Sequence, residues 1–149
     1  MIQSLSISSR SESLLQTLLN IWETSVRSTH LFLSEKDIAD LRPLVLQGLG
    51  VIDQLLIYSV NEGNAPLGFM GIQDHKIEML FISPTAMGQS IGKKLVTHAI
   101  DHLNVQSVDV NEQNPRALGF YEHMGFCVVE RSPLDEQGTP FPILHMKLR

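Results

Sequence analysis

The chain has 149 residues, of which 43% are hydrophobic and 18% charged. This balance excludes a disordered protein and suits a single domain over residues 1–149 with a sizeable core. The net charge of −5 argues against general nucleic-acid binding, which needs a basic surface to neutralise phosphates.

The amino-terminal segment predicts a strand, because Leu5 and Ile7 alternate with polar residues. It is rich in serine and lacks the cationic start and apolar block of a signal peptide. No apolar run approaches the ~18 residues of a membrane span. Cys127 is the only cysteine, so we expect no disulfide and no cysteine metal cluster. A soluble protein of the reducing cytoplasm, not bound to a membrane, is therefore expected.

Two helices are predicted after this strand. Apolar residues recur at helical spacing over residues 14–22, and Ser11 or Ser13 can provide the N-cap. The next helix has Ser34 as its N-cap and is expected to break or kink near Pro43.

The rest of the chain alternates between strand and helix patterns. Strands are predicted at 54–60, 65–73, 76–83, 106–110, 126–132 and 142–148, and helices at 90–103 and 114–124. The complete order is β-α-α-β-β-β-α-β-α-β-β, which indicates an α+β sandwich with a mixed sheet covered by helices.

Residues 111–126 form the first informative segment. Asn114 is a good N-cap, and the proline after it suits the first helical position. Tyr121 lies in the middle of the helix, and Gly125 fits the left-handed conformation that closes it. Folding alone explains most of this pattern, and Tyr121 can be a core aromatic residue whose hydroxyl finds a partner.

Residues 80–94 form the second informative segment, in which a strand, a glycine-containing loop and a helix start follow one another. The free amides of such a helix start attract phosphate, and Gly88 and Gly92 allow close backbone approach. Lys93 and Lys94 lie in the first helical turn, where the helix dipole disfavours cations unless an anion lies between them and the amides. The simpler interpretation is an ordinary strand–turn–helix with two solvated lysines.

Together these segments resemble the GNAT family of N-acetyltransferases. In that family a Q/R-x-x-G-x-G/A loop binds the pyrophosphate of acetyl-CoA, and the aligned positions here are Met87-Gly88-Gln89-Ser90-Ile91-Gly92. Met87 replaces the usual Arg or Gln, and Ser90 replaces the middle Gly. The family's second segment, N-x-x-A-x-x-F-Y-x-x-x-G-F, binds the pantetheine arm and holds a general-acid tyrosine. It is complete here and includes Asn114 and Tyr121.

The resemblance implies a mostly antiparallel central sheet of about seven strands, in which the strand 76–83 parts from the strand 106–110. Backbone amides of Leu80, Phe81 and Ile82 would then face acetyl-CoA. The segment 21–34 looks like a bacterial subgroup of small GNAT proteins proposed to act on amines or protein lysines. Dimers are common in the family, so the resemblance allows a homodimer.

Two residues are candidates for the base that deprotonates the acceptor amine. Glu78 is the one carboxylate in an apolar strand, and alternation places it on one face with Leu80 and Ile82. Apolar neighbours would raise its pKa, although a solvent-facing glutamate fits the pattern equally well. His30 is the alternative base or an acceptor-site residue, and Trp22 and Phe32 are candidates for the same acceptor wall or for the core.

The predicted function is direct transfer of an acetyl group from acetyl-CoA to a primary amine of a small molecule or protein, without a metal. The alternative is an acyl-CoA-binding module without catalysis. The predicted catalytic residues are Tyr121 and Glu78, the predicted acceptor-site residues are Trp22, His30 and Phe32, and the predicted cofactor-binding residues are Leu80, Phe81, Ile82, Met87, Gly88, Gln89, Ser90, Gly92, Lys93 and Asn114.

Overall fold

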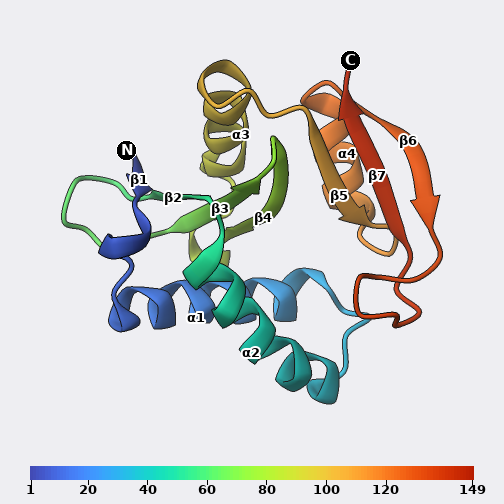
Figure 1. Ribbon diagram of the computed structural model, residues 1–149, viewed down its shortest axis with the longest axis horizontal. Helices are drawn as coiled ribbons and strands as arrows, with labels where there is room; N and C mark the ends of the chain where they lie inside the picture. Colours follow the sequence, from blue (N-terminus) through green and yellow to red (C-terminus); the bar gives the residue numbers. More distant parts are fainter.

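A computed structural model describes all 149 residues and shows a single seven-stranded sheet in the order β1-β2-β3-β4-β5-β7-β6 (Figure 1). The strands are β1 (Ile2–Leu5), β2 (Gln54–Tyr58), β3 (Gly68–Gln73), β4 (Lys76–Ile82), β5 (Ser107–Asn111), β6 (Phe126–Ser132) and β7 (Ile143–Leu148). The α-helices are α1 (Glu12–Thr29), α2 (Glu35–Val51), α3 (Ile91–His102) and α4 (Pro115–His123). This element order is the predicted one.

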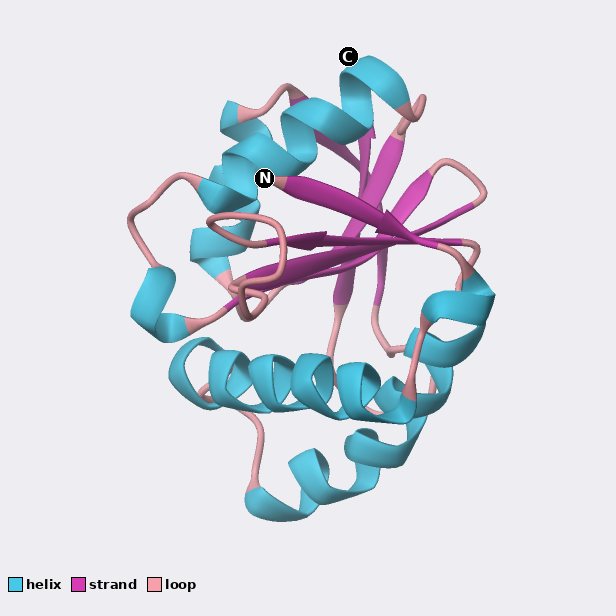
Figure 2. Ribbon diagram, turned by 90° about the vertical axis from the view of Figure 1, so that its left-hand side faces the viewer, coloured by secondary structure: helices cyan, strands magenta, loops and turns pink.

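The sheet lies between two layers of helices (Figure 2). One core cluster joins α1 and α2 to one face of the sheet, with Leu18, Leu49 and Phe69 at its centre. The other joins α3 and α4 to the opposite face, around Leu95 and Phe126. Neighbouring strands are antiparallel except for β4 and β5, so the predicted α+β sandwich with a mostly antiparallel sheet is confirmed.

Side-chain caps define where the first two helices begin. Ser11, rather than Ser13, caps α1 by accepting a hydrogen bond from the Leu14 amide at 3.2 Å. Ser34 and Asp37 form a reciprocal capping box at the start of α2. The helix continues through Pro43, so the predicted break does not occur. The buried residues Ile38 and Leu49 lie on either side of the proline, and their packing maintains one helix.

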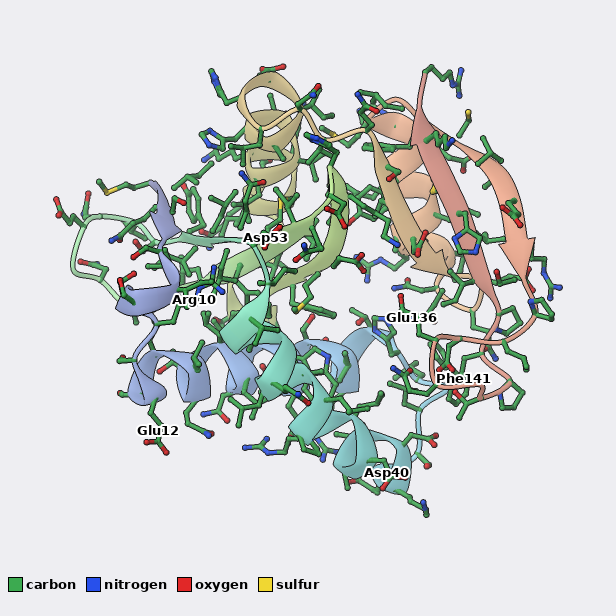
Figure 3. The ribbon with its side chains drawn as sticks, viewed as in Figure 1. Arg10, Glu12, Asp40, Asp53, Glu136 and Phe141 are labelled. Atoms are coloured by element: carbon green, nitrogen blue, oxygen red, sulfur yellow. The ribbon has the colours of Figure 1, made fainter.

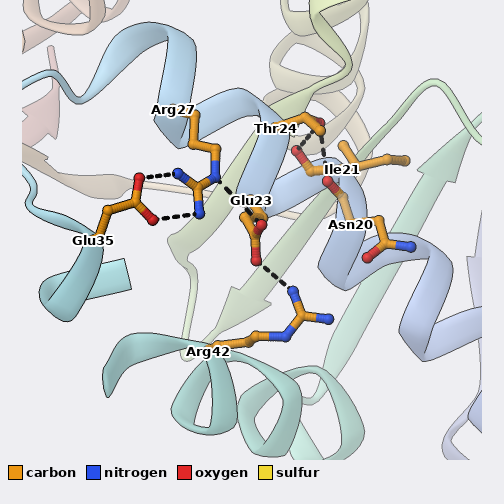
Figure 4. Close-up of polar contacts among 7 residues, drawn as sticks. All are labelled: Asn20, Ile21, Glu23, Thr24, Arg27, Glu35 and Arg42. Atoms are coloured by element: carbon orange, nitrogen blue, oxygen red, sulfur yellow. Dashed lines mark hydrogen bonds and ion pairs between the residues drawn. The ribbon is translucent and has the colours of Figure 1, made fainter. Parts of the chain in front are cut away.

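Ion pairs join α1 to α2 along their exposed sides (Figure 4). Glu23 of α1 pairs with Arg42 of α2, and Arg27 of α1 pairs with both Glu23 and Glu35. Exposed pairs of this kind contribute up to ~1 kcal/mol each, so they add only modestly to the apolar packing that holds α1 and α2 together.

A buried arginine anchors the amino-terminal segment to the end of α2. The Arg10 side chain is 7% exposed, and its guanidinium donates to the carbonyl oxygens of Leu5, Leu49 and Ile52. These acceptors include carbonyls that the end of a helix leaves unpaired. The predicted strand is shorter than expected, because Ile7 lies in a 3-10 turn and is exposed.

The parallel pair β4–β5 separates soon after it begins. Only Lys76–Ser107 and Ile77–Val108 are paired, whereas β4 pairs with β3 as far as Ile82. Figure 1 shows the two strands diverging. The separation that the resemblance implied is therefore present, and it leaves one edge of β4 without a strand partner.

A register shift next to Gly71 and Ile72 makes Glu78 the extra residue of a β-bulge. Leu80 and Ile82 share a face, as predicted, and pack toward α3 and α4, but Ile77 packs on that side too. Glu78 instead shares a face with Lys76, its ion-pair partner. The predicted grouping of Glu78 with Leu80 and Ile82 is wrong, because a bulge interrupts strict alternation.

Candidate active site

Two cavities lie where β4 and β5 separate, one of about 460 Å³ and one of about 150 Å³. We call them the larger and the smaller cavity. The residues that line both are His30, Leu80, Phe81, Asn114, Ala117 and Tyr121. The larger volume falls within the ~300–1,000 Å³ typical of small-molecule sites, and the smaller one suits a slender group.

The loop before α3 forms one end of the larger cavity. Met87, Gly88, Ser90 and Gly92 line it, whereas Gln89 does not. Ser90 adopts the left-handed conformation, with φ 61° and ψ 24°, and its side chain makes no capping hydrogen bond. The first amides of α3 have no intrahelical acceptor and carry partial positive charge. The loop therefore has free helix-start amides of the kind that attract anions, and Ser90 within it adopts a conformation that favours glycine.

The larger cavity is lined by two cationic side chains and by no carboxylate. Lys93 lines it, as predicted, together with Arg116, and His123 also lines it. Arg116 and His123 were not among the predicted cofactor-binding residues. Their spacing of seven residues within one helix was the available signal, because it places both side chains on the same face of α4. The charge of this cavity fits an anionic ligand.

The unpaired edge of β4 supplies backbone donors between the cavities. The Ser83 amide donates to the Leu67 carbonyl of the β3 side at 2.8 Å, and ladder bonds alternate along an antiparallel pair. The amides of Leu80 and Ile82 therefore face the separation from β5, and the Phe81 amide faces β3. The prediction is thus supported for Leu80 and Ile82, whereas Phe81 contributes cavity lining rather than an amide donor.

Tyr121 lies at the junction of the two cavities. Its ring is 6% exposed and packs against Phe120 and Phe126, with centroids at 5.0 and 5.7 Å. The hydroxyl has no protein partner, and no fully buried side-chain oxygen is left unpaired, so the hydroxyl reaches the cavity surface. Burial raises the Tyr121 pKa well above its usual value. The phenol is therefore protonated at neutral pH and available as a donor.

Glu78 lines the smaller cavity with 30% of its side chain exposed. Burial raises the pKa of its carboxyl, and the Lys76 ammonium at 3.3 Å opposes that shift. The bulge brings Glu78 to the cavity that Tyr121 also lines. A carboxylate with a raised pKa in such a place is suited to accept a proton.

His30 lines both cavities at the end of α1. Its Nδ1 lies 2.8 Å from the Thr29 hydroxyl, which donates its own proton to the Ser25 carbonyl. This arrangement assigns the imidazole proton to Nδ1 and leaves the Nε2 lone pair available. Burial lowers the His30 pKa, so the ring is neutral at neutral pH.

The other two predicted acceptor-site residues do not line either cavity. Trp22 is 4% exposed and belongs to the core cluster under α1 and α2, so its assignment to the acceptor wall is wrong. It lies in mid-helix on the face that packs on the sheet. Phe32 packs between His30 and Phe141, with ring centroids at 5.4 and 5.5 Å. It joins the α1–α2 loop to the β6–β7 loop beside the smaller cavity.

Asn114 is positioned as predicted, but its side chain already has a role in the fold. It lines both cavities, and its side-chain oxygen accepts a hydrogen bond from the Ala117 amide at 3.2 Å to cap α4.

No group of three His, Cys, Asp or Glu side chains is placed to hold a metal ion. No helix combines the length and the apolar character needed to span a bilayer.

A separated parallel strand pair, a loop with free helix-start amides and a buried phenol that lines two cavities are the features that the resemblance to GNAT N-acetyltransferases implied. The model of the acetyltransferase (GNAT) domain matches residues 51–149. The chain is 41% identical over 131 residues to the peptidyl-lysine N-acetyltransferase YjaB of Salmonella typhimurium, covering 88% of this chain and 89% of that protein.

Solved structures show the same arrangement. The solution structure of apo-form YjaB from Escherichia coli has a TM-score of 0.85 at 35% identity, covering 99% of this chain and 95% of that one. The PaiA N-acetyltransferase of Thermoplasma acidophilum, solved in complex with coenzyme A, has a TM-score of 0.66 at 20% identity over 100% and 99% of the two chains, and it shows the fold alone. The chain belongs to the GNAT family and is an N-acetyltransferase with acetyl-CoA as its acetyl donor.

Proposed function

We propose that this protein acetylates lysine side chains of proteins or peptides by direct transfer from acetyl-CoA in a ternary complex. The observation that carries the proposal is the Tyr121 hydroxyl, which is unpaired and lies between two cavities of different character. The larger cavity is cationic and suits the donor. The smaller one is lined by Glu78, and its volume of about 150 Å³ suits an alkylammonium chain. The Salmonella typhimurium relative described above is a peptidyl-lysine N-acetyltransferase.

The residues of the larger cavity suit the chemical parts of acetyl-CoA. The amides at the start of α3, with Gly88 and Ser90 before them, would hold the pyrophosphate. Lys93 and Arg116 would add positive charge beside the phosphates. The apolar lining between this loop and Tyr121 would take the pantetheine arm. The donor then supplies a thioester carbonyl, and this chain supplies its orientation and its hydrogen-bond donors.

Glu78 would take the first proton. A lysine ammonium has a pKa of ~10.4 and is not nucleophilic until it is deprotonated. Once Glu78 has accepted that proton, the nitrogen lone pair can form a C–N bond to the acetyl carbonyl carbon. His30 is the alternative base, because its Nε2 is unprotonated and because it lines the same cavity as Glu78.

The strand edge and Tyr121 would complete the transfer. The amides of Leu80 and Ile82 would donate to the carbonyl oxygen as it gains negative charge. When the C–S bond breaks, Tyr121 would protonate the departing thiolate. The nitrogen loses its second proton as the amide forms, and Tyr121 recovers a proton through water. The products are an acetylated lysine and coenzyme A with a free thiol.

The test is incubation of the protein with acetyl-CoA and an N-terminally blocked peptide that contains one lysine. We expect release of coenzyme A and a mass increase of one acetyl group on that lysine. A matched peptide with a free amino terminus and no lysine should not be modified. Tight binding of acetyl-CoA in calorimetry without turnover on any amine would overturn the proposal and favour the non-catalytic acyl-CoA-binding module.

A further inference from the structure

The two cavities differ sharply in charge. The side chains that line the larger one include Lys93, Arg116 and His123 and no carboxylate. Those that line the smaller one include the carboxylates of Glu78 and Asp109 and no lysine or arginine. A substrate that approaches through the smaller cavity therefore meets negative charge.

Lys76 neutralises only part of this charge. Its ammonium lies 3.3 Å from the Glu78 carboxylate and 3.0 Å from that of Asp109. His145 bonds the other oxygen of Asp109 through Nδ1 at 2.8 Å. One lysine is shared between two carboxylates, and both keep part of their side-chain surface, 30% and 22%, open to solvent.

A third carboxylate faces the same place from the β6–β7 loop. Figure 3 places Glu136 between the end of α1 and the carboxyl end of β5. Its charge acts on the Glu78 carboxyl and contributes to the raised pKa of that group. The stacking of Phe141 on Phe32 holds this loop against the α1–α2 loop. We call Glu78, Asp109 and Glu136 the acidic mouth.

The acidic mouth opens onto a group that has no partner within the protein. The Tyr121 side chain is more than nine-tenths buried, lines the smaller cavity, and has a hydroxyl without a protein hydrogen bond. Two of these carboxylates, Glu78 and Asp109, therefore line the same cavity as a free donor. They are more than a solvated surface cluster.

We propose that the acidic mouth selects acceptor lysines that carry a second cationic side chain next to them in sequence. This inference rests on the proposed acetylation of lysine. The acceptor ammonium loses its charge at Glu78, so a lasting attraction requires another positive group. A neighbouring arginine or lysine would lie at the mouth of the smaller cavity, near Asp109, which lines it, and near Glu136 of the β6–β7 loop.

Three blocked peptides test the preference, each with one acceptor lysine flanked by arginine, glutamine or glutamate. The measured quantity is kcat/KM for coenzyme A release at low and high salt. We expect the arginine peptide to exceed the glutamate peptide by about tenfold at low ionic strength, and the ratio to fall as salt screens the exposed charges. The effect should appear in KM, because the neighbouring charge does not take part in the chemical step.

Charge changes at Glu136 test the structural assignment. Glu136→Gln should reduce the arginine-to-glutamate ratio about threefold, and Glu136→Lys should reduce it further. Glu12→Gln makes the same charge change at the start of α1, far from Glu136 in Figure 3, and should leave the ratio unchanged. Turnover of the glutamine peptide should change little in Glu12→Gln.

The possible failures are distinguishable. Equal kcat/KM for the three peptides would overturn the preference and leave lysine acetylation intact. A preference that is the same in Glu136→Gln and Glu136→Lys as in the unaltered protein would overturn the assignment to the acidic mouth. Acetylation of none of the peptides would overturn both the proposed function and the preference.

Discussion

Replacing Tyr121 with phenylalanine removes one oxygen atom and leaves the packing of the ring in place. The ring lies between Phe120 and Phe126 and is 6% exposed. Its hydroxyl makes no hydrogen bond to the protein, so the substitution breaks none. We expect the free energy of unfolding to change by less than ~0.5 kcal/mol, which would make any loss of activity attributable to the hydroxyl.

The activity should fall much further than the stability. A positioned general acid contributes about 10²- to 10⁴-fold to the rate, which corresponds to roughly 2.7–5.4 kcal/mol of transition-state stabilisation. Because the raised pKa keeps the phenol protonated, the defect should persist throughout the neutral pH range. The affinity for acetyl-CoA should change little, since the arm is held mainly by backbone and apolar groups.

Single-turnover assays with saturating acetyl-CoA would measure the chemical step directly. The chain has two tyrosines, and the other, Tyr58, is the matched control. It lies on β2, lines neither cavity, and its hydroxyl accepts a hydrogen bond from Lys94 at 3.3 Å. Tyr58→Phe should keep the normal rate. If Tyr121→Phe and the unaltered protein turned over at equal rates, Tyr121 would not be the acid and the reasoning would fail.

Three further substitutions test other parts of the site and fold. Glu78→Gln should lower the rate of acetylation at neutral pH, and the rate should recover at higher pH, because the free amine becomes abundant toward its pKa of ~10.4. A pH–rate profile without this recovery would favour His30 as the base. Ser90→Gly should raise the melting temperature by ~1–4 °C. Glycine removes the cost of the left-handed conformation, ~1–2 kcal/mol, and this gain exceeds the ~0.4–1 kcal/mol by which glycine's greater freedom favours the unfolded chain. A lower melting temperature would contradict this expectation. Arg10→Met should cost about 2–4 kcal/mol in urea unfolding, because buried carbonyls lose their donor, and an unchanged midpoint would show that those carbonyls find other partners.

The element order could be predicted because its signals are local. Caps such as Ser34 and Asn114, the glycine that closes α4 and the periodicity of apolar residues each act within a few positions of the chain. These local signals depend on neighbouring residues in the sequence, and the folded protein keeps the helices and strands that they predict. The two GNAT segments are equally local, so the donor loop and Tyr121 were found together.

Features that depend on distant neighbours could not be predicted in this way. The bulge at Glu78 arises from the register between β3 and β4, and no residue within β4 marks it. The burial of Trp22 depends on which side of α1 packs on the sheet. Glu136 lies near Glu78 because the β6–β7 loop packs against the α1–α2 loop through the contact of Phe141 with Phe32. In each case the partner lies far away in sequence.

Because β4 and β5 separate, the stability of the folded protein depends on the concentration of acetyl-CoA. Strand edges that remain open in the free protein would be covered when acetyl-CoA lies between them. A ligand present at a hundred times its dissociation constant adds about 2.7 kcal/mol to the free energy of unfolding. Binding of acetyl-CoA would therefore lower the fraction of unfolded chains and slow the proteolysis that acts on them.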